Sequence, residues 1–484
     1  MNLNQILLTD LYQLTMAQGY WETGKGSLEA CFHAYFRNYP FEGGYAIACG
    51  MNELAELIEG FTFSESDLDY LGALPAPGGG KLFKPAFIDY LRTFKLDVDI
   101  DAVYEGTVVF PHEPLVRVKG SIVQCQLLET ALLNCVMFET LIATKAARIC
   151  AVAQAPVAEF GLRRAQGAAG GMWASRAAIV GGCASTSNVL AGKMYNVPVS
   201  GTHAHSWVMA FDSELEAFRA YAKAFPLNCV LLIDTYNVDQ GLQNAITVGL
   251  EMRERGERLI GVRIDSGDLA WLAKKARTAL DNAGLTDCGV VLSNDLDEYA
   301  IQSIVAQGAT VASWGVGTKL SVAYDQPTLG GVYKLSATRQ SPDDVWVDQL
   351  KISEASIKLT VPGVLDIKRY YYDNGHIAGD MVFDVNATAD PDEVIVDPYD
   401  AMRRKTLAGL RFERLLHPLC QAGTVVLEPE YRDAMAAQAR TRASLETLDE
   451  TQKRLMKPHT YPVGLDRGLF ERRAELALRL KGLG

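Results

Sequence analysis

The sequence has no long hydrophobic run, no excess of basic residues and no typical secretion signal. No uninterrupted apolar stretch approaches about 18 residues, so we expect no membrane-spanning helix. The first residues, MNLNQILLTD, lack the basic start and long apolar core of a signal peptide. The formal net charge of −12 argues against a nucleic-acid binder held by bulk charge, although it leaves room for a local cationic pocket.

Cysteine is present but is not arranged for metal binding or disulfides. The nine cysteines are scattered, their number is odd, and none forms a C-x-x-C pair. A zinc knuckle is therefore not expected, and we predict no metal-ligating residues in the chain. Scattered cysteines in apolar surroundings are typical of buried free thiols in a reducing compartment. We therefore expect a cytoplasmic protein.

Four stretches in the middle of the chain share one design: an apolar β-run, a polar or glycine-rich end, and then a helical pattern. They are VLLIDTYN (230–237), LIGVRIDSGD (259–268), GVVLSND (289–295) and TVASWGVGT (310–318). This alternation favours a parallel sheet. Ligands of such sheets bind where the carboxyl ends of the strands converge. The Asp, Thr, Arg, Ser and Gly residues at these four ends therefore predict a polar ligand site.

The chain is long enough for two or three domains. Residues 1–120 mix helix and strand, and we expect them to form one domain with residues 340–484. Residues 121–339 begin with a long apolar helix and continue as alternating strands and helices, so we predict a second, α/β domain there. No internal repeat is visible.

Two motifs predict phosphate contacts. In RIDSGDLAWLAKKA, Ser266 and Gly267 make a turn after a strand, and Asp268 is placed to cap the next helix. The functional interpretation puts a phosphate on the Ser266–Gly267 amides and a ribose or a metal near Asp265; a plain capped turn is the alternative. In WGVGTKL, two glycines allow a ligand to approach the backbone closely, although such a pair is more often a tight turn.

Two further motifs predict chemistry and ring binding. SGTHAHSWVM holds two histidines two residues apart, which suits a nucleophilic or acid/base imidazole at a strand end; two polar loop histidines are the alternative. In EFGLRRA, Phe160 and Arg163 suit a flat anionic ring, by stacking and by pairing with a carboxylate. An aromatic core residue and an arginine at a helix start are the alternative there.

Taken together, these motifs resemble the nicotinate phosphoribosyltransferase family over almost the whole chain. The matching segments run from LLTDLYQLTMAQGYW through YFRNYPFEGGYAIACG, EFGLRRAQG, ASTSNVLAGK, GTHAHSWVM, LLIDTYNV, RIDSGDLA, WGVGTKL and GGVYKL to YPVGLDRGL. The resemblance implies transfer of phosphoribose to nicotinate, coupled to ATP hydrolysis through a phosphohistidine, in the pathway of NAD salvage. It implies Mg²⁺ with the diphosphate and ATP. It also implies a homodimer with shared active sites. The implied fold is an irregular TIM-like (β/α) barrel plus an α/β sandwich domain built from both ends of the chain.

The resemblance also assigns residues. His205 matches the phosphorylated histidine, whereas His203 falls where the family varies. Asp265 is the second candidate catalytic residue. The candidate substrate-binding residues are Asp10, Tyr12, Phe160, Arg163, Ser185, Asn188, Thr202, Asp234 and Arg263. The candidate phosphate-binding residues are Arg37, Ser266, Gly267, Ser293, Asn294, Gly315, Gly317, Thr318, Lys334 and Lys358. Asp10 and Tyr12 are implied to reach the partner subunit's site, and an unidentified acid is expected to orient His205.

Two alternatives stay open. A nicotinamide phosphoribosyltransferase has the same fold but an acid where this chain has Asn188; that carboxylate would repel nicotinate, so Asn188 favours nicotinate. A non-catalytic relative is the other alternative, and the presence of His205, Asp265 and the glycine loop argues against it.

Overall fold

The computed structural model describes residues 6–352, 359–387 and 392–483. The chain forms two compact units: Met1–Leu141 together with Thr328–Gly484, and Ile142–Pro327. The sequence placed these junctions near residues 120 and 340. No helix in the described part of the chain is both long and apolar enough to cross a membrane.

The second unit is built on a six-stranded sheet with the order β7-β6-β11-β10-β9-β8. Every pairing within it is parallel. The strands are β6 Val157–Glu159, β7 Ser185–Thr186, β8 Val230–Leu232, β9 Gly261–Ile264, β10 Gly289–Ser293 and β11 Ser313–Val316. The predicted alternation of strand and helix is therefore confirmed. In the described residues β7 and β8 are the outer members of the sheet, so the closed barrel stays a prediction.

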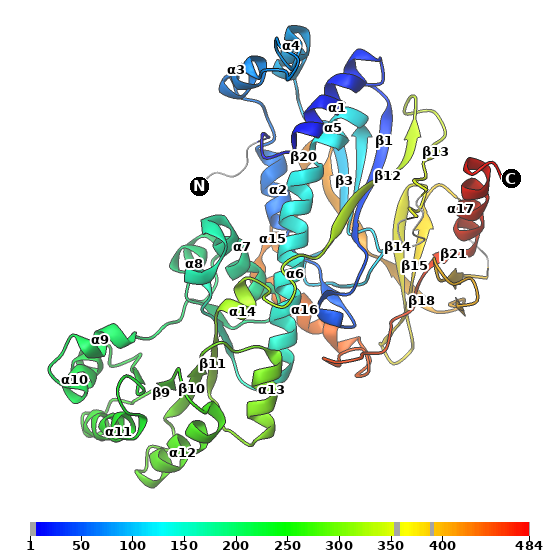
Figure 1. Cartoon of the computed structure of the whole chain (residues 1–484). Helices are drawn as coiled ribbons and strands as arrows, with labels where there is room; N and C mark the ends of the chain where they lie inside the picture. Colours follow the sequence, from blue (N-terminus) through cyan, green and yellow to red (C-terminus); the bar gives the residue numbers. More distant parts are fainter. Residues whose placement is uncertain (1–5, 353–358, 388–391, 484) are drawn as a thin grey trace. The chain divides into compact units, whose positions relative to one another are not determined.

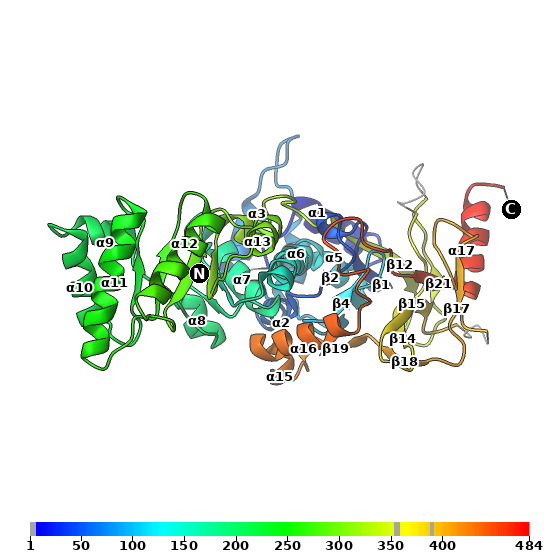
Figure 2. The ribbon, with the colours of Figure 1, turned by 90° about the horizontal axis from the view of Figure 1, so that it is seen from below.

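Local sequence explains where the connecting helices begin. The side chains of Asn237, Asp268 and Asp297 accept hydrogen bonds from backbone N–H groups at the starts of α11, α12 and α13. Each such cap stabilises its helix by about 1 kcal/mol. Helices α10, α11 and α12 pack in sequence order (Figures 1 and 2). The helices of this unit are α7 Gly167–Val180, α8 Val189–Tyr195, α9 His205–Met209, α10 Glu214–Ala224, α11 Val238–Glu254, α12 Leu269–Asn282, α13 Glu298–Ala306 and α14 Thr318–Ser321, with the 3-10 turn η2 Leu162–Arg164.

The first unit combines the two ends of the chain in one seven-stranded sheet, with the order β13-β12-β1-β5-β3-β19-β20. Strand β1 pairs antiparallel with β12, with Glu29 opposite Arg339. The strands are β1 Glu29–Phe36, β3 Val98–Val103, β5 Val116–Ser121, β12 Gly331–Arg339, β13 Val347–Asp348, β19 Leu416–Gln421 and β20 Thr424–Val425. A short ladder pairs β2 Ala46–Ile47 with β4 Val108–Val109.

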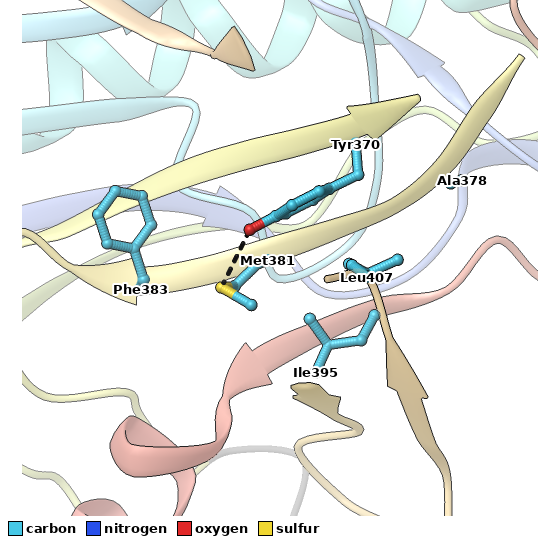
Figure 3. Close-up of a cluster of buried hydrophobic side chains, with 6 residues drawn as sticks. All are labelled: Tyr370, Ala378, Met381, Phe383, Ile395 and Leu407. Atoms are coloured by element: carbon cyan, nitrogen blue, oxygen red, sulfur yellow. Dashed lines mark hydrogen bonds between the residues drawn. The ribbon is translucent and has the colours of Figure 1, made fainter. Parts of the chain in front are cut away.

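A second sheet of this unit, β17-β16-β21-β15-β14-β18, comes entirely from the C-terminal segment. Both faces of its central strands are buried, and Figure 3 shows an apolar cluster formed by side chains from several strands of this sheet. The cluster comprises Tyr370, Ala378, Met381, Phe383, Ile395 and Leu407. Burying each large side chain contributes roughly 1.5–3 kcal/mol. The strands are β14 Leu365–Tyr371, β15 Ile377–Asp384, β16 Val394–Val396, β17 Arg404–Thr406, β18 Arg411–Arg414 and β21 Val463–Asp466.

The remaining helices belong to the first unit, except that α6 continues past residue 141. They are α1 Leu11–Glu22, α2 Met51–Glu59, α3 Glu65–Ala73, α4 Pro85–Arg92, α5 Ile122–Leu127, α6 Glu129–Ala153, α15 Pro429–Arg432, α16 Ala434–Glu446 and α17 Arg467–Leu480, with the 3-10 turn η1 Pro40–Glu42. No cysteine is in a disulfide and eight of the nine are buried, as predicted; Cys150 is half-buried.

Candidate active site

The parallel register brings the ends of neighbouring strands to one edge of the sheet. Leu232 pairs with Arg263, Ser293 with Gly315, and Val316 with Glu159. The residues that follow these positions therefore gather at the carboxyl edge, where ligands of parallel sheets bind. The predicted polar site lies there.

Arg263 is the centre of this edge. Its Nη2 donates to Asp265 Oδ1 at 3.1 Å, its Nε to Ser293 Oγ at 2.9 Å, and its Nη1 to Thr202 Oγ1 at 2.9 Å. Ser293 Oγ in turn donates to Asp265 Oδ1. The guanidinium thus fixes three predicted site residues through charge-assisted hydrogen bonds. Because the Arg263 side chain is only 15% exposed, it serves as a rigid support.

Asp234 joins the same edge from the neighbouring strand. Its Oδ2 accepts from the backbone N of Asp265 at 2.9 Å and from Ser266 Oγ at 2.6 Å. Its Oδ1 is buried and has no hydrogen-bond partner within the described chain. A buried carboxylate oxygen of this kind calls for a donor or a cation from a ligand. Hard oxygen atoms of two neighbouring aspartates suit Mg²⁺.

Phe160 follows β6 and is seated by the glycines of the WGVGTKL motif. The backbone N of Phe160 donates to Val316 O at 2.7 Å. A Cβ on Gly315 would lie 2.7 Å from carbon atoms of the Phe160 ring, and one on Gly317 would lie 3.2 Å from Phe160 O. The Cζ of Arg263 lies 5.8 Å from the ring centroid. The glycines therefore give the aromatic ring its place beside Arg263, and their predicted phosphate contact stays a prediction, as does that of Thr318, the first residue of α14.

The turn before α12 is open to solvent. Ser266 and Gly267 are exposed, and Gly267 has φ +82°, which an L side chain rarely adopts. Asp268 accepts from the backbone N of Trp271 at 3.0 Å and so caps the helix, as predicted. Asn294, also exposed, has φ +105°. These exposed backbone segments suit a ligand with phosphate oxygens.

The two histidines differ sharply. His203 is buried; its Nε2 accepts from the backbone N of Leu232 at 3.2 Å, so its Nδ1 carries the proton and faces Ala204 O at 3.3 Å. Both ring nitrogens of His203 are thus used by the fold. His205, the first residue of α9, contacts Thr235 Oγ1 through Nδ1 at 3.2 Å and has no further hydrogen bond within the described chain. The accessible imidazole nitrogen is therefore on His205.

Comparisons with known proteins agree with this geometry. The model of the nicotinate phosphoribosyltransferase family matches residues 156–354 of this chain. The models of the N-terminal and C-terminal domains of nicotinate phosphoribosyltransferase match residues 7–137 and 366–473. Nicotinate phosphoribosyltransferase of Bacillus subtilis is 43% identical, over 95% of this chain and 92% of that protein. The chain belongs to the nicotinate phosphoribosyltransferase family. It is therefore an enzyme of the nicotinate phosphoribosyltransferase type, which belongs to NAD biosynthesis.

Human relatives match in sequence and in fold. The human nicotinate phosphoribosyltransferase is 34% identical, over 96% of this chain and 95% of that protein. The crystal structure of human nicotinic acid phosphoribosyltransferase superimposes with a TM-score of 0.83 at 32% identity, covering 97% of this chain and 99% of that one. A nicotinate-nucleotide pyrophosphorylase from Pyrococcus furiosus, with a TM-score of 0.68 and 21% identity, shares the fold.

Three of the family's expected ring-site residues occupy contrasting positions. Arg163 lies in η2 and is exposed, so its guanidinium is accessible to a substrate carboxylate. Ser185 Oγ lies 2.6 Å from Ser200 Oγ. Asn188 is 2% exposed, and its Oδ1 caps α8 by accepting from the backbone N of Ala191 at 3.2 Å. The side chain expected to decide between nicotinate and nicotinamide is therefore held inside the fold.

The other expected residues belong to the first unit. Asp10 lies directly before α1 and accepts from Thr130 Oγ1 at 2.9 Å; Tyr12 is exposed on α1. The Nε of Arg37 is buried and has no hydrogen-bond partner within the described residues. Burial lowers the pKa of Lys334, whose Nζ donates to Tyr333 O at 3.0 Å. Lys358 lies outside the described residues, and the roles of all five stay predictions.

The structure adds residues that the motifs did not single out. Thr235 contacts the imidazole of His205, although its only sequence signal is its place after Asp234 in LLIDTYN. Glu159 and Ser175 contact the segments that hold Phe160 and Asn188. Glu159 stands directly before Phe160 in EFGLRRA, but a single acid beside an aromatic residue carries no specific signal. A group of metal-ligand type, Cys49, Glu105 and Glu139, is buried in the first unit and shares no residue with the predicted site.

The neutral state of His203 makes part of the stability depend on pH. Burial, as the largest cause, lowers the pKa of His203 from 6.5 to about 4. The unfolded chain binds the proton more readily than the folded protein does. The free energy of unfolding that the neutral His203 contributes is therefore complete above pH 6.5 and is lost as the pH falls from 6.5 towards 4. We expect His203→Gln, whose side-chain oxygen can still accept from Leu232, to have a melting temperature that falls less over this range than that of the wild type. Parallel acid limbs in thermal unfolding of both proteins would contradict this.

Proposed function

We propose that the chain transfers the 5-phosphoribosyl group of 5-phosphoribosyl 1-diphosphate to nicotinate, giving nicotinate mononucleotide and diphosphate. ATP hydrolysis through a phosphohistidine at His205 is coupled to this transfer. The observation that supports the proposal most directly is the cluster of Arg263, Asp265, Ser293 and Asp234 at one sheet edge, with Phe160 beside it. Family membership supports the choice of reaction.

The transfer breaks the bond between the anomeric carbon and a diphosphate oxygen and forms a bond from the pyridine nitrogen to that carbon. The carbon becomes cation-like in between, so the site must accept ribose hydroxyls, hold phosphates and orient a flat ring. Asp265, fixed by Arg263 and Ser293, is placed to hold ribose hydroxyls without reorganisation. Ser266, Gly267 and Asn294 offer accessible groups for phosphate.

The residues at this edge also fit a divalent cation. Asp234 and Asp265 would face a Mg²⁺ ion bound to the diphosphate, since Asp234 Oδ1 has no partner in the described chain. When bound, Mg²⁺ supplies neutralisation of the leaving group's charge. The exposed guanidinium of Arg163 and the ring of Phe160 suit the nicotinate carboxylate and pyridine ring.

For the ATP-coupled step, the free nitrogen of His205 attacks the γ-phosphoryl group, and ADP leaves as the phosphorus–nitrogen bond forms. Water later cleaves that bond and releases phosphate. Thr235 holds the other ring nitrogen in the observed conformation. Among the described residues Thr235, and no acidic side chain, is hydrogen-bonded to the His205 ring, so the acid expected to orient it stays a prediction.

The proposal extends to the fold and the assembly. The alternation from β6 to β11 supports an irregular barrel in the second unit, and the seven-stranded sheet shared by both chain ends supports a sandwich domain in the first. Leu8, Leu11, Tyr12 and Met16 at and near α1 are all more than one-third exposed, an apolar surface that suits a homodimer contact. Free buried thiols are consistent with a cytoplasmic location.

One assay tests the reaction itself. The protein is incubated with 5-phosphoribosyl 1-diphosphate and either nicotinate or nicotinamide, with and without ATP, and the mononucleotide formed is measured. Turnover of nicotinate far above nicotinamide is expected, because Arg163 can pair with a carboxylate and residue 188 is an amide. Faster turnover of nicotinamide would point to the nicotinamide alternative and equal rates to a non-selective site, and no turnover of either would indicate a non-catalytic relative.

A mixing experiment tests the dimer. If Tyr12 completes the partner subunit's site, Tyr12→Ala and His205→Ala proteins, each impaired alone, should recover part of the ATP-stimulated activity once mixed and re-associated. The matched control is Tyr70→Ala, which removes another exposed tyrosine, from α3, and should leave activity unchanged. A fully active monomer, or mixtures no more active than the sum of their parts, would rule out shared sites.

A further inference from the structure

Glu159, the last residue of β6, is a buried carboxylate that accepts three hydrogen bonds. Its side chain is 1% exposed. Its Oε2 accepts from Thr186 Oγ1 at 2.6 Å and from Ser175 Oγ at 3.0 Å. Its Oε1 accepts from the backbone N of Gly161. No basic side chain contacts it among the described residues, so neutral donors satisfy this acid.

The same two hydroxyls contact Asn188. The backbone N of Asn188 donates to Thr186 Oγ1 at 3.0 Å, and its Nδ2 donates to Ser175 Oγ at 3.1 Å. A hydroxyl has one proton to donate. Thr186 gives its proton to Glu159, and Ser175 gives its proton either to Glu159 or to Gly171 O at 2.9 Å. In both cases only lone pairs of these oxygens face Asn188.

The backbone N of residue 188 donates to Thr186 Oγ1 whatever the side chain, so the side chain itself must donate to Ser175 Oγ while accepting from the backbone N of Ala191. An asparagine amide meets both requirements, with its Nδ2 toward Ser175 and its Oδ1 toward Ala191. An aspartate meets only the second requirement. Its oxygen caps a helix as well as that of asparagine, but a carboxylate has no N–H to donate to Ser175. The other oxygen of the aspartate would face a lone pair of Ser175 Oγ, and beyond that hydroxyl lies the carboxylate of Glu159. Two carboxylates this close repel each other in a buried setting.

Glu159 also fixes the ring-binding turn. Its bond to Gly161 lies between Phe160 and η2, which contains Arg163. The approach is close, since a Cβ on Gly161 would lie 2.9 Å from Glu159 Oε1 and 2.3 Å from Ser321 Oγ. One carboxylate thus holds both the segment with the stacking ring and the segment with Asn188.

We propose that Glu159 is the positioning residue that sets ring-substituent selectivity: through Ser175 it requires an amide at position 188 and excludes an acid there. The proposal deepens the assignment of nicotinate as substrate and rests on it. Glu159 acts through its neighbours, with no contact to the substrate required.

The test is a double-mutant cycle of Glu159→Gln and Asn188→Asp. A glutamine amide at position 159 can donate to the Ser175 hydroxyl, which frees the Ser175 proton to point at the side chain of residue 188. Asn188→Asp alone is therefore expected to lower the melting temperature and to cut the nicotinate-to-nicotinamide ratio of kcat/KM by about tenfold or more. Adding Glu159→Gln should restore much of the melting temperature lost in Asn188→Asp.

The matched control is Asn237→Asp, which makes the same change at the cap of α11, where Asn237 Oδ1 accepts from the backbone N of Asp239 and Gln240. The change that Asn237→Asp makes in the melting temperature should be the same with and without Glu159→Gln. Additive effects of Asn188→Asp and Glu159→Gln would overturn the proposal. So would a Glu159→Gln protein that loses kcat equally for both rings with an unchanged ratio, which indicates a merely structural acid.

Two further measurements keep the test decisive. If Glu159→Gln does not fold, Ser175→Ala is the substitute, because it removes the hydroxyl between Glu159 and Asn188. It should raise the KM for nicotinate more than it lowers kcat. An unchanged nicotinate-to-nicotinamide ratio of kcat/KM in Ser175→Ala then overturns the proposal. If the wild type does not use nicotinate, the proposed function fails, whereas coupling of melting temperatures between positions 159 and 188 still tests the link through Ser175.

Discussion

The His205→Ala protein is expected to take up no label from the γ-phosphate of ATP and to turn over nicotinate only at the ATP-independent rate. The imidazole nitrogen is the nucleophile in the proposed phosphorylation, and alanine provides none. Contacts to ribose, ring and diphosphate lie on other residues, so slow transfer without ATP should remain. Acid-labile, base-stable labelling of the wild type, together with ATPase activity, measures the effect.

The matched control for this prediction is His203→Gln. His203 uses both ring nitrogens within the fold, with Leu232 N on one side and Ala204 O on the other. Its replacement should leave the phosphoprotein intact. Label that persists in His205→Ala but disappears in the position-203 variant would reverse the assignment of the two histidines.

Asp265→Asn should reduce kcat/KM for 5-phosphoribosyl 1-diphosphate by about 10²- to 10³-fold, the cost of losing one preorganised electrostatic group at a reacting centre. The carboxylate is oriented by Arg263 and Ser293 before the substrate arrives, and an amide of the same shape lacks its charge. Steady-state kinetics with varied 5-phosphoribosyl 1-diphosphate measure the loss.

Asp268→Asn makes the same chemical change three residues away. Asp268 caps α12 through Trp271, and asparagine caps equally well, so this control should stay close to wild type in rate and stability. Phosphorylation of His205 should persist in Asp265→Asn. A rate for Asp265→Asn within a few fold of wild type would remove Asp265 from the catalytic assignment.

Several features could be predicted because they depend on neighbours in the sequence. The strand–helix alternation, the cap formed by Asp268 and the turn at Gly267 are local, and the structure contains each of them. The motif that contains His205 also distinguished two histidines in part, since only one of them matched the family's phosphorylated position. The sequence did not predict which of the two the fold buries.

What the sequence by itself determined is the chemical inventory: an acidic chain with free thiols, polar residues at the ends of apolar strands, and motifs of one enzyme family. Only the tertiary structure decided which groups meet. Arg263 reaches Thr202 across 61 residues of sequence, and Glu159 reaches Thr186 across 27. Such pairs form because parallel pairing aligns strand ends from distant segments, and no local pattern encodes that register. Asn188 shows the consequence: its amide was visible as a residue type, but the buried hydroxyls and the carboxylate that require it became visible only in the folded chain.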